Sequence, residues 1–71
     1  MSQWPSAKSR QILFALLRIG WRIKREKSGS HKVISHEAYP DYVFSLHDNE
    51  EIGPKMLARI AKRTGLTPDD L

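Results

Sequence analysis

Three histidines are the side chains of this sequence best suited to transfer a proton near neutral pH: His31, His36 and His47. His31 directly follows a Lys27-Ser28-Gly29-Ser30 segment, and Lys32 is its next neighbour in the chain. Cations around an imidazole attract a phosphate and stabilise the negative charge that develops when a phosphodiester is cleaved. This setting makes His31 the first candidate for acid–base chemistry.

RNA is the substrate class that such chemistry would suit. Its 2′-hydroxyl can attack the adjacent phosphodiester once a base removes the hydroxyl proton. The imidazole of His31 could take that proton or could donate one to the leaving 5′ oxygen, and neither step requires a metal. The alternative, which the residues alone favour, is that His31 is a polar residue at the start of a strand.

Other kinds of catalytic centre find less support. The chain has no cysteine, which excludes disulfides, thiolate catalysis and Cys-bound zinc. His31 and His36 are separated by an odd offset, so a strand would direct them to opposite faces, and there is no HExxH motif. Ser28 and Ser30 lack the context of a nucleophile elbow. We expect no metal site and no cofactor.

The length of the chain predicts a single domain, residues 1–71, and its charge favours a partner of negative charge. The chain has 12 Lys plus Arg and 8 Asp plus Glu, and residues 1–35 hold eight of the basic side chains and only one acid. A basic half is typical of proteins that bind a polyanion, although a solvated surface is the alternative. The cations expected to contact phosphate are Arg22, Lys24, Arg25, Lys27 and Lys32.

The longest apolar run, Ile12 to Leu17, is six residues, whereas a membrane span needs about 20. The first residues show no basic region followed by an apolar stretch, so a signal peptide is not indicated. We therefore expect a soluble, cytoplasmic protein with no membrane partner.

Apolar residues at helical spacing predict a helix over residues 6–19, with Ser6 as its N-cap and Gly20 as its stop. Alternating residues then predict strands over 21–26, 31–36 and 42–47, with a turn at 37–41. A second helix should begin at Pro54 and stop at Gly65, before a short helical turn near 67–70.

The order is helix, three-stranded meander, helix. Both helices can cover one face of the sheet, made of Trp21, Ile23, Tyr42, Phe44 and Leu46, which gives a small two-layer α+β domain with one open sheet face. We expect Trp21 to pack in the core rather than stack on a base.

Val33 and Ile34 are adjacent and both apolar, so the sequence does not decide on which face of the sheet His31 lies. If Ile34 points into the core, His31 shares the open face with Arg22, Lys24 and His47; if Val33 does, His31 faces the rim of the helices. We expect His36 to be exposed and without a role.

Several short motifs together resemble the HicA family of toxins, over about Pro5 to Leu66. The motifs are Leu17-x-x-Gly20-Trp21, Arg25-x-x-x-Gly29-Ser30-His31, Leu46-His47-Asp48-Asn49-x-Glu51-Ile52 and Leu57-x-x-Ile60-x-x-x-x-Gly65-Leu66. The resemblance implies a fold like that of double-stranded-RNA-binding domains, in agreement with the α-β-β-β-α order. It also implies an mRNA interferase of a type II toxin–antitoxin system, and a HicB-like antitoxin that covers the active surface.

The resemblance assigns roles to three parts of the chain. His31 takes the place of the family's catalytic histidine, and Gly29 and Ser30 form the turn that presents it. His47 matches a second recurrent histidine, although Ser45 stands here where the family commonly has proline. We therefore expect a metal-independent endoribonuclease, monomeric when free, with His31 as the acid–base residue and His47 assisting. The alternative is a non-catalytic RNA-binding module that uses the same basic hairpin.

Overall fold

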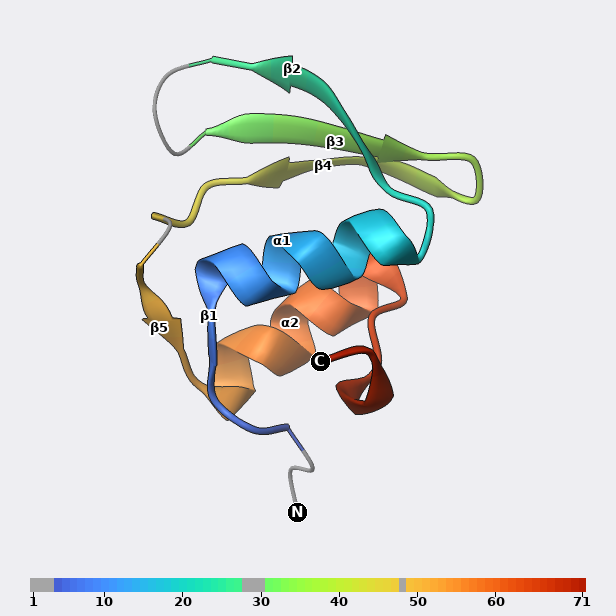
Figure 1. The fold of residues 1–71 in the computed structure, drawn as a ribbon. Coiled ribbons are helices and arrows are strands. Elements are labelled where there is room, and N and C mark those ends of the chain that lie inside the picture. The colour runs from blue at the N-terminus through green and yellow to red at the C-terminus, as the bar shows by residue number, and fades with distance from the viewer. Residues whose placement is uncertain (1–3, 28–30, 48) are drawn as a thin grey trace.

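A three-stranded antiparallel sheet lies over two helices (Figure 1). The computed structural model describes residues 4–27, 31–47 and 49–71. The strands, in spatial order, are β2 (Arg22–Glu26), β3 (Lys32–His36) and β4 (Tyr39–Phe44), and the helices are α1 (Ser9–Arg18) and α2 (Pro54–Thr64). Both helices cover the same face of the sheet in Figure 1. The predicted two-layer α+β fold, with its α-β-β-β-α order, is therefore confirmed.

The predicted start of the first helix is wrong. Ala7–Lys8 forms a short strand, β1, which pairs antiparallel with β5 (Glu51–Ile52), and α1 begins at Ser9. Ser6 is exposed and lies outside the helix. Strand pairing buries Ala7 and Ile52, each 3% exposed, in the core, and this burial outweighs the local preference for a longer helix. Two residues far apart in the sequence supply a contact that local periodicity cannot reveal.

The predicted helix ends are confirmed. Gly20 and Gly65 follow α1 and α2 with φ of 107° and 77°, in a region that glycine reaches without steric cost. Pro54 is the first residue of α2, as its fixed φ favours. The predicted C-terminal turn is the short helix η1 (Pro68–Asp70), which has Thr67 at its N-cap.

Strand β4 begins three residues earlier than predicted, because His36 closes a tighter turn. Its Nδ1 accepts a hydrogen bond from the backbone N–H of Ala38 at 3.0 Å, and its Nε2 lies 3.1 Å from the carbonyl oxygen of Ile19. Nδ1 as an acceptor requires the tautomer in which Nε2 carries the proton and donates it to Ile19. The expectation that His36 is exposed is wrong: it is half-buried, and its ring centroid lies 5.2 Å from that of Trp21 and 5.1 Å from that of Tyr39.

The core lies between the sheet and the helices. Its fully buried side chains include Ile12, Leu16, Ile34 and Leu57, and Trp21 is 1% exposed, as predicted. Ile23 is the exception to the predicted core face. It is 41% exposed, because β2 is an edge strand whose pairing with β3 shifts register between Ile23 and Arg25. In the part of the chain that the structure describes, no helix is long and apolar enough to cross a membrane.

Candidate active site

The burial of Ile34 decides which face of the sheet carries His31. Ile34 is fully buried in the core cluster, with Ile23 and Tyr42 as its cross-strand partners. Its neighbour Val33 therefore points to the opposite, open face, where its partners in register are Arg25 and Val43. Alternation along β3 places His31 on the same open face as Val33.

The hairpin between β2 and β3 brings Lys27 and His31 together. The backbone N–H of Lys27 donates to the carbonyl oxygen of His31 at 3.0 Å, which extends the ladder beyond the pair Glu26 and Lys32. Both Lys27 and His31 are exposed. Gly29 and Ser30, expected to present the histidine, lie outside the described residues.

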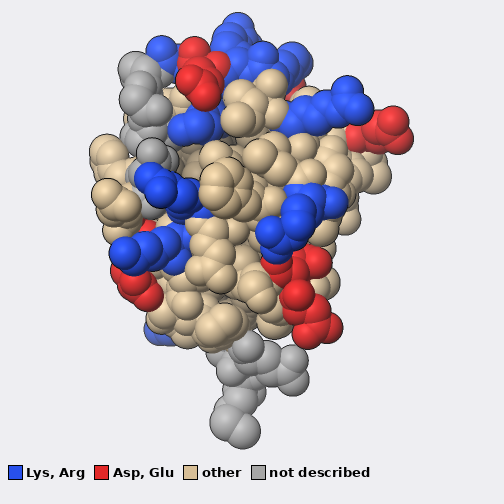
Figure 2. Space-filling view, viewed as in Figure 1, with Lys and Arg blue, Asp and Glu red and all other residues tan. Residues whose placement is uncertain are grey.

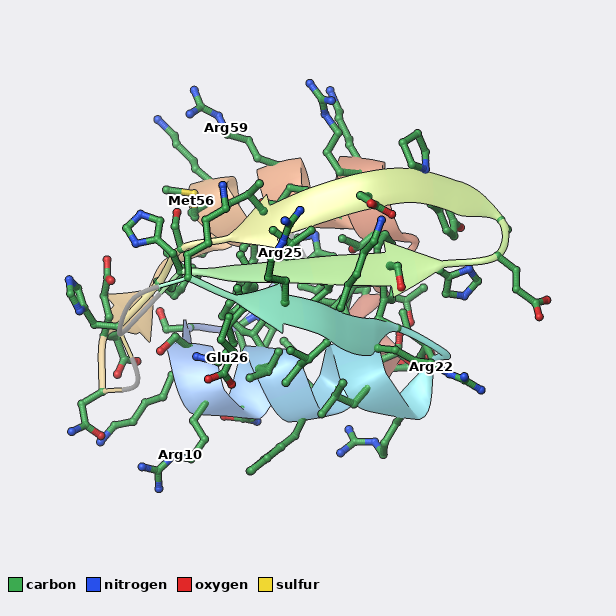
Figure 3. All side chains as sticks on the ribbon, turned by 90° about the horizontal axis from the view of Figure 1, so that it is seen from above. Arg10, Arg22, Arg25, Glu26, Met56 and Arg59 are labelled. Carbon is green, nitrogen blue, oxygen red and sulfur yellow. The ribbon has the colours of Figure 1, made fainter. Side chains whose placement is uncertain are left out.

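Arg25 is the cation that stands over the open face nearest this hairpin. Figure 3 looks down on the sheet and shows its side chain rising over the strands. Arg25 lies two residues before Lys27, and its register partner Val33 lies two residues after His31. Within residues 4–27, 31–47 and 49–71, neither Arg25 nor Lys27 has an ion-pair partner. The structure thus gathers an imidazole and two unpaired cations at one end of the sheet.

The other predicted cations are placed differently. The Nζ of Lys24 forms an ion pair with the Oδ2 of Asp41 at 2.8 Å, which offsets its charge. Arg22 pairs with Ser35 at the far end of β2, and Figure 3 shows it away from Arg25. Lys32 is half-buried, in register with Glu26 and with the core residue Phe44, so it belongs to the helix-facing side. These three residues are not gathered with His31.

His47 lies at the same end of the sheet as His31, because the start of β3 pairs with the end of β4 through Lys32 and Phe44. Its backbone is held in place although its side chain is exposed. The carbonyl oxygen of His47 accepts hydrogen bonds from the hydroxyl of Ser9 and, at 3.0 Å, from the backbone N–H of Glu50. The N–H of His47 donates to the Oε1 of Glu50 at 3.2 Å.

Sequence reasoning missed Ser9 and Glu50 as residues that fix the His47 loop. Ser9 is 1% exposed, and its own N–H donates to the carbonyl oxygen of Glu50 at 2.9 Å. The first turn of α1 therefore anchors the loop on both sides. The only sequence signal was a short hydroxyl residue near a helix start, and Ser6 carried the same signal.

Among the residues that the structure describes, no group of three or more His, Asp or Glu side chains is placed to hold a metal ion. What the described side chains offer a phosphodiester is one exposed imidazole, a second imidazole at the same end of the sheet, and free cationic groups.

A comparison with known protein families gives a match over most of the chain. Residues 9–66 match a protein family described as the HicA toxin of bacterial toxin–antitoxin systems. A search of curated proteins finds no significant match. The matched span covers both helices, all three strands of the sheet and the hairpin that carries His31. The chain therefore belongs to the HicA toxin family of bacterial toxin–antitoxin systems, which implies that a cognate antitoxin is its partner.

Proposed function

We propose that this toxin is an endoribonuclease that cleaves mRNA without a metal ion, with His31 as the acid–base residue. The observation that carries the proposal is the position of His31. Its exposed imidazole lies on the open face of the sheet, at the hairpin end, with Arg25 and Lys27 as its neighbouring cations. This combination suits a backbone phosphate with an adjacent 2′-hydroxyl.

The proposed reaction is transesterification within the RNA. The 2′ oxygen forms a bond to the adjacent phosphorus, and the bond between phosphorus and the 5′ oxygen breaks. The proton of the 2′-hydroxyl is removed, and a proton is delivered to the leaving 5′ oxygen, so the products are a 2′,3′-cyclic phosphate and a 5′-hydroxyl. His31 performs one of these transfers. Arg25 and Lys27 contact the nonbridging phosphate oxygens, which gain negative charge in the transition state.

His47 is proposed to assist at the same phosphate. Its loop is anchored by Ser9 and Glu50, so its backbone position is fixed relative to α1. An exposed imidazole at the His31 end of the sheet can supply the second proton transfer or orient the substrate. A HicB-like antitoxin would inhibit the toxin by covering this open face, and the free toxin would act as a monomer.

The test is cleavage of a long mRNA by the purified chain in the presence of EDTA. Wild type should give fragments with 5′-hydroxyl ends, whereas His31→Ala and His31→Gln should give none and still bind RNA. His31→Gln is the sharper variant, because glutamine keeps hydrogen-bonding capacity but cannot transfer a proton near neutral pH. Cleavage that survives in His31→Gln would contradict the assigned role. Salt-sensitive binding without cleavage by wild type would favour the non-catalytic RNA-binding module.

A further inference from the structure

The outer face of α1 carries an exposed aromatic ring among unpaired cations. Phe14 is 54% exposed, the highest value among the large apolar side chains of the described residues. Arg10 and Arg18 lie four residues before and after it, so all three share one side of the helix. Figure 2 shows basic side chains over both ends of α1 with uncharged surface between them.

This surface forms an open groove of about 370 Å³. Among the residues that the structure describes, its lining combines three cations, two amides and one aromatic ring, with no acidic side chain: Lys8, Arg10, Gln11, Phe14, Arg18 and Asn49. A groove with this lining offers positive charge, hydrogen-bonding amides and a flat apolar platform together. That combination suits a partner that has phosphates and planar bases.

The cations of the groove are available to a ligand. In the described parts of the chain, the one ion pair joins Lys24 and Asp41, so Lys8, Arg10 and Arg18 have no carboxylate partner there. Arg18 donates instead to the backbone carbonyl of Asp70. The Asp70 carboxylate is occupied by Thr67, whose N–H and hydroxyl both bond to its Oδ2, at 2.8 and 3.0 Å. Arg18 is therefore positioned by the C-terminal turn without losing its charge.

The groove is continuous with the loop that carries His47. Asn49, one of its lining residues, lies between His47 and Glu50, and Ser9 of α1 bonds to both of those residues. A strand of RNA that passes the His47 end of the sheet can therefore continue over Asn49 and along α1. The second groove, beside Trp21 and His36, includes Glu37 as well as Arg22 and lacks this continuity.

We propose that the α1 groove binds the single-stranded RNA that flanks the cleaved phosphate, with one base stacked on Phe14. Lys8, Arg10 and Arg18 hold the phosphates on either side of that base, and Gln11 and Asn49 contact sugar or base edges. The proposal rests on the proposed ribonuclease function for its class of ligand. An antitoxin segment is the competing occupant, and RNA binding that does not depend on Phe14 would favour it.

Binding is measured in the full chain carrying His31→Ala, which keeps the RNA intact. The probes are a labelled single-stranded RNA and inorganic polyphosphate, which has the charge but no bases. Phe14→Ala should weaken RNA binding about 5-fold to 100-fold, which corresponds to one lost stacking contact. It should leave polyphosphate binding unchanged, and Phe14→Tyr should restore RNA binding. Arg10→Gln should weaken binding to both probes and lower the salt slope for RNA by about 0.7.

Two residues of α2 serve as matched controls. Met56 is 42% exposed, and Arg59 is exposed as well. Figure 3 shows both on the opposite side of the molecule from Arg10. Met56→Ala and Arg59→Gln should leave RNA binding within about 2-fold of the parent. Equal losses in the Phe14 and Met56 variants would overturn the proposal. So would unchanged RNA binding by Phe14→Ala, whether or not that variant also loses the antitoxin.

The test of the α1 groove can be read separately from the test of ribonuclease activity. If wild type cleaves RNA and Phe14→Ala binds it normally, the α1 groove fails as an RNA site while the proposed function stands. If wild type does not cleave and Phe14→Ala still loses RNA selectively, the groove stands as an RNA-binding surface and the catalytic proposal fails.

Discussion

The indole N–H of Trp21 donates a hydrogen bond to the carbonyl oxygen of Thr64, with 3.0 Å between the two heavy atoms. This bond joins the residue that follows the α1 stop to the last residue of α2. The Thr64 hydroxyl in turn donates to the carbonyl oxygen of Ile60 at 2.8 Å and accepts from the N–H of Leu66 at 3.3 Å. Trp21 and Thr64 are buried, so the C-terminal end of α2 is fixed beneath the sheet by polar groups that water does not reach.

Trp21→Phe should lower the free energy of unfolding by about 1–3 kcal/mol, because it removes the donor to a buried carbonyl. The smaller ring adds a cavity cost of the same sign. Urea unfolding followed by circular dichroism measures the change. Phe14→Leu, at an exposed site on α1, is the control and should change stability by less than about 0.5 kcal/mol. Equal losses in the two variants would show that the buried hydrogen bond is not the cause.

Gly65→Ala should destabilise the protein strongly, whereas Gly53→Ala should not. Gly65 has φ of 77°, and a Cβ there would overlap the ring and hydroxyl of Tyr39. The left-handed conformation alone costs an alanine about 1–2 kcal/mol, and the overlap adds to it. Gly53 has an ordinary φ of −83° and open space around it, so its change should stay within about 1 kcal/mol. Thermal unfolding of the two variants provides the comparison.

Ser9→Ala should lower both stability and, if His47 assists, the cleavage rate. The variant loses the hydroxyl donor to the His47 carbonyl at a site that is 1% exposed, at a cost of about 1 kcal/mol or more. Ser6→Ala is the matched control, because Ser6 is exposed and lies before α1. A decrease in kcat shared by Ser9→Ala and His47→Ala, but absent from Ser6→Ala, would assign Ser9 a positioning role. Normal stability in Ser9→Ala would contradict the structural role.

Arg25→Ala should reduce the catalytic efficiency of RNA cleavage by about 10-fold or more, because a charge-assisted contact to phosphate is lost near His31. The salt slope of RNA binding should fall by about 0.7 at the same time. Arg59→Ala removes an exposed arginine from α2 and should have no comparable effect. Cleavage kinetics of the two variants at several salt concentrations measure both losses of catalytic efficiency. An Arg59 effect equal to that of Arg25 would indicate a general charge effect.

Stability should decline in alkaline solution partly through Tyr42. Burial raises the pKa of the Tyr42 phenol above its ordinary value of 10.0, and Arg63 opposes part of this rise. The folded state then retains the phenol proton at a pH where the unfolded state has released it. The stability that comes from burying the neutral phenol is therefore fully present below pH 10 and is lost as pH rises through the folded pKa.

Unfolding measured at several pH values around and above pH 10 should show a smaller decline in Tyr42→Phe than in wild type. Direct titration of the tyrosinate absorbance reports the same phenol. Identical pH dependence in the two proteins would contradict the assignment.

The sequence by itself determined the features that depend on neighbouring residues. Glycine and proline set the helix ends at Gly20, Pro54 and Gly65, since their conformational limits act locally. Alternation and helical spacing gave the order of the helices and of the three-stranded sheet. The HicA-like motifs indicated the family, which the match over residues 9–66 then confirmed.

Tertiary structure alone decided which side chains share a surface. Val33 and Ile34 are both β-branched, and only packing against the helices determined that Ile34 is buried and His31 lies on the open face. The strand at Ala7 and the half-buried position of His36 depend on partners distant in the sequence, Ile52 and Ile19. Local patterns cannot encode such contacts, because their free energy comes from burying surfaces that meet only when the chain is folded.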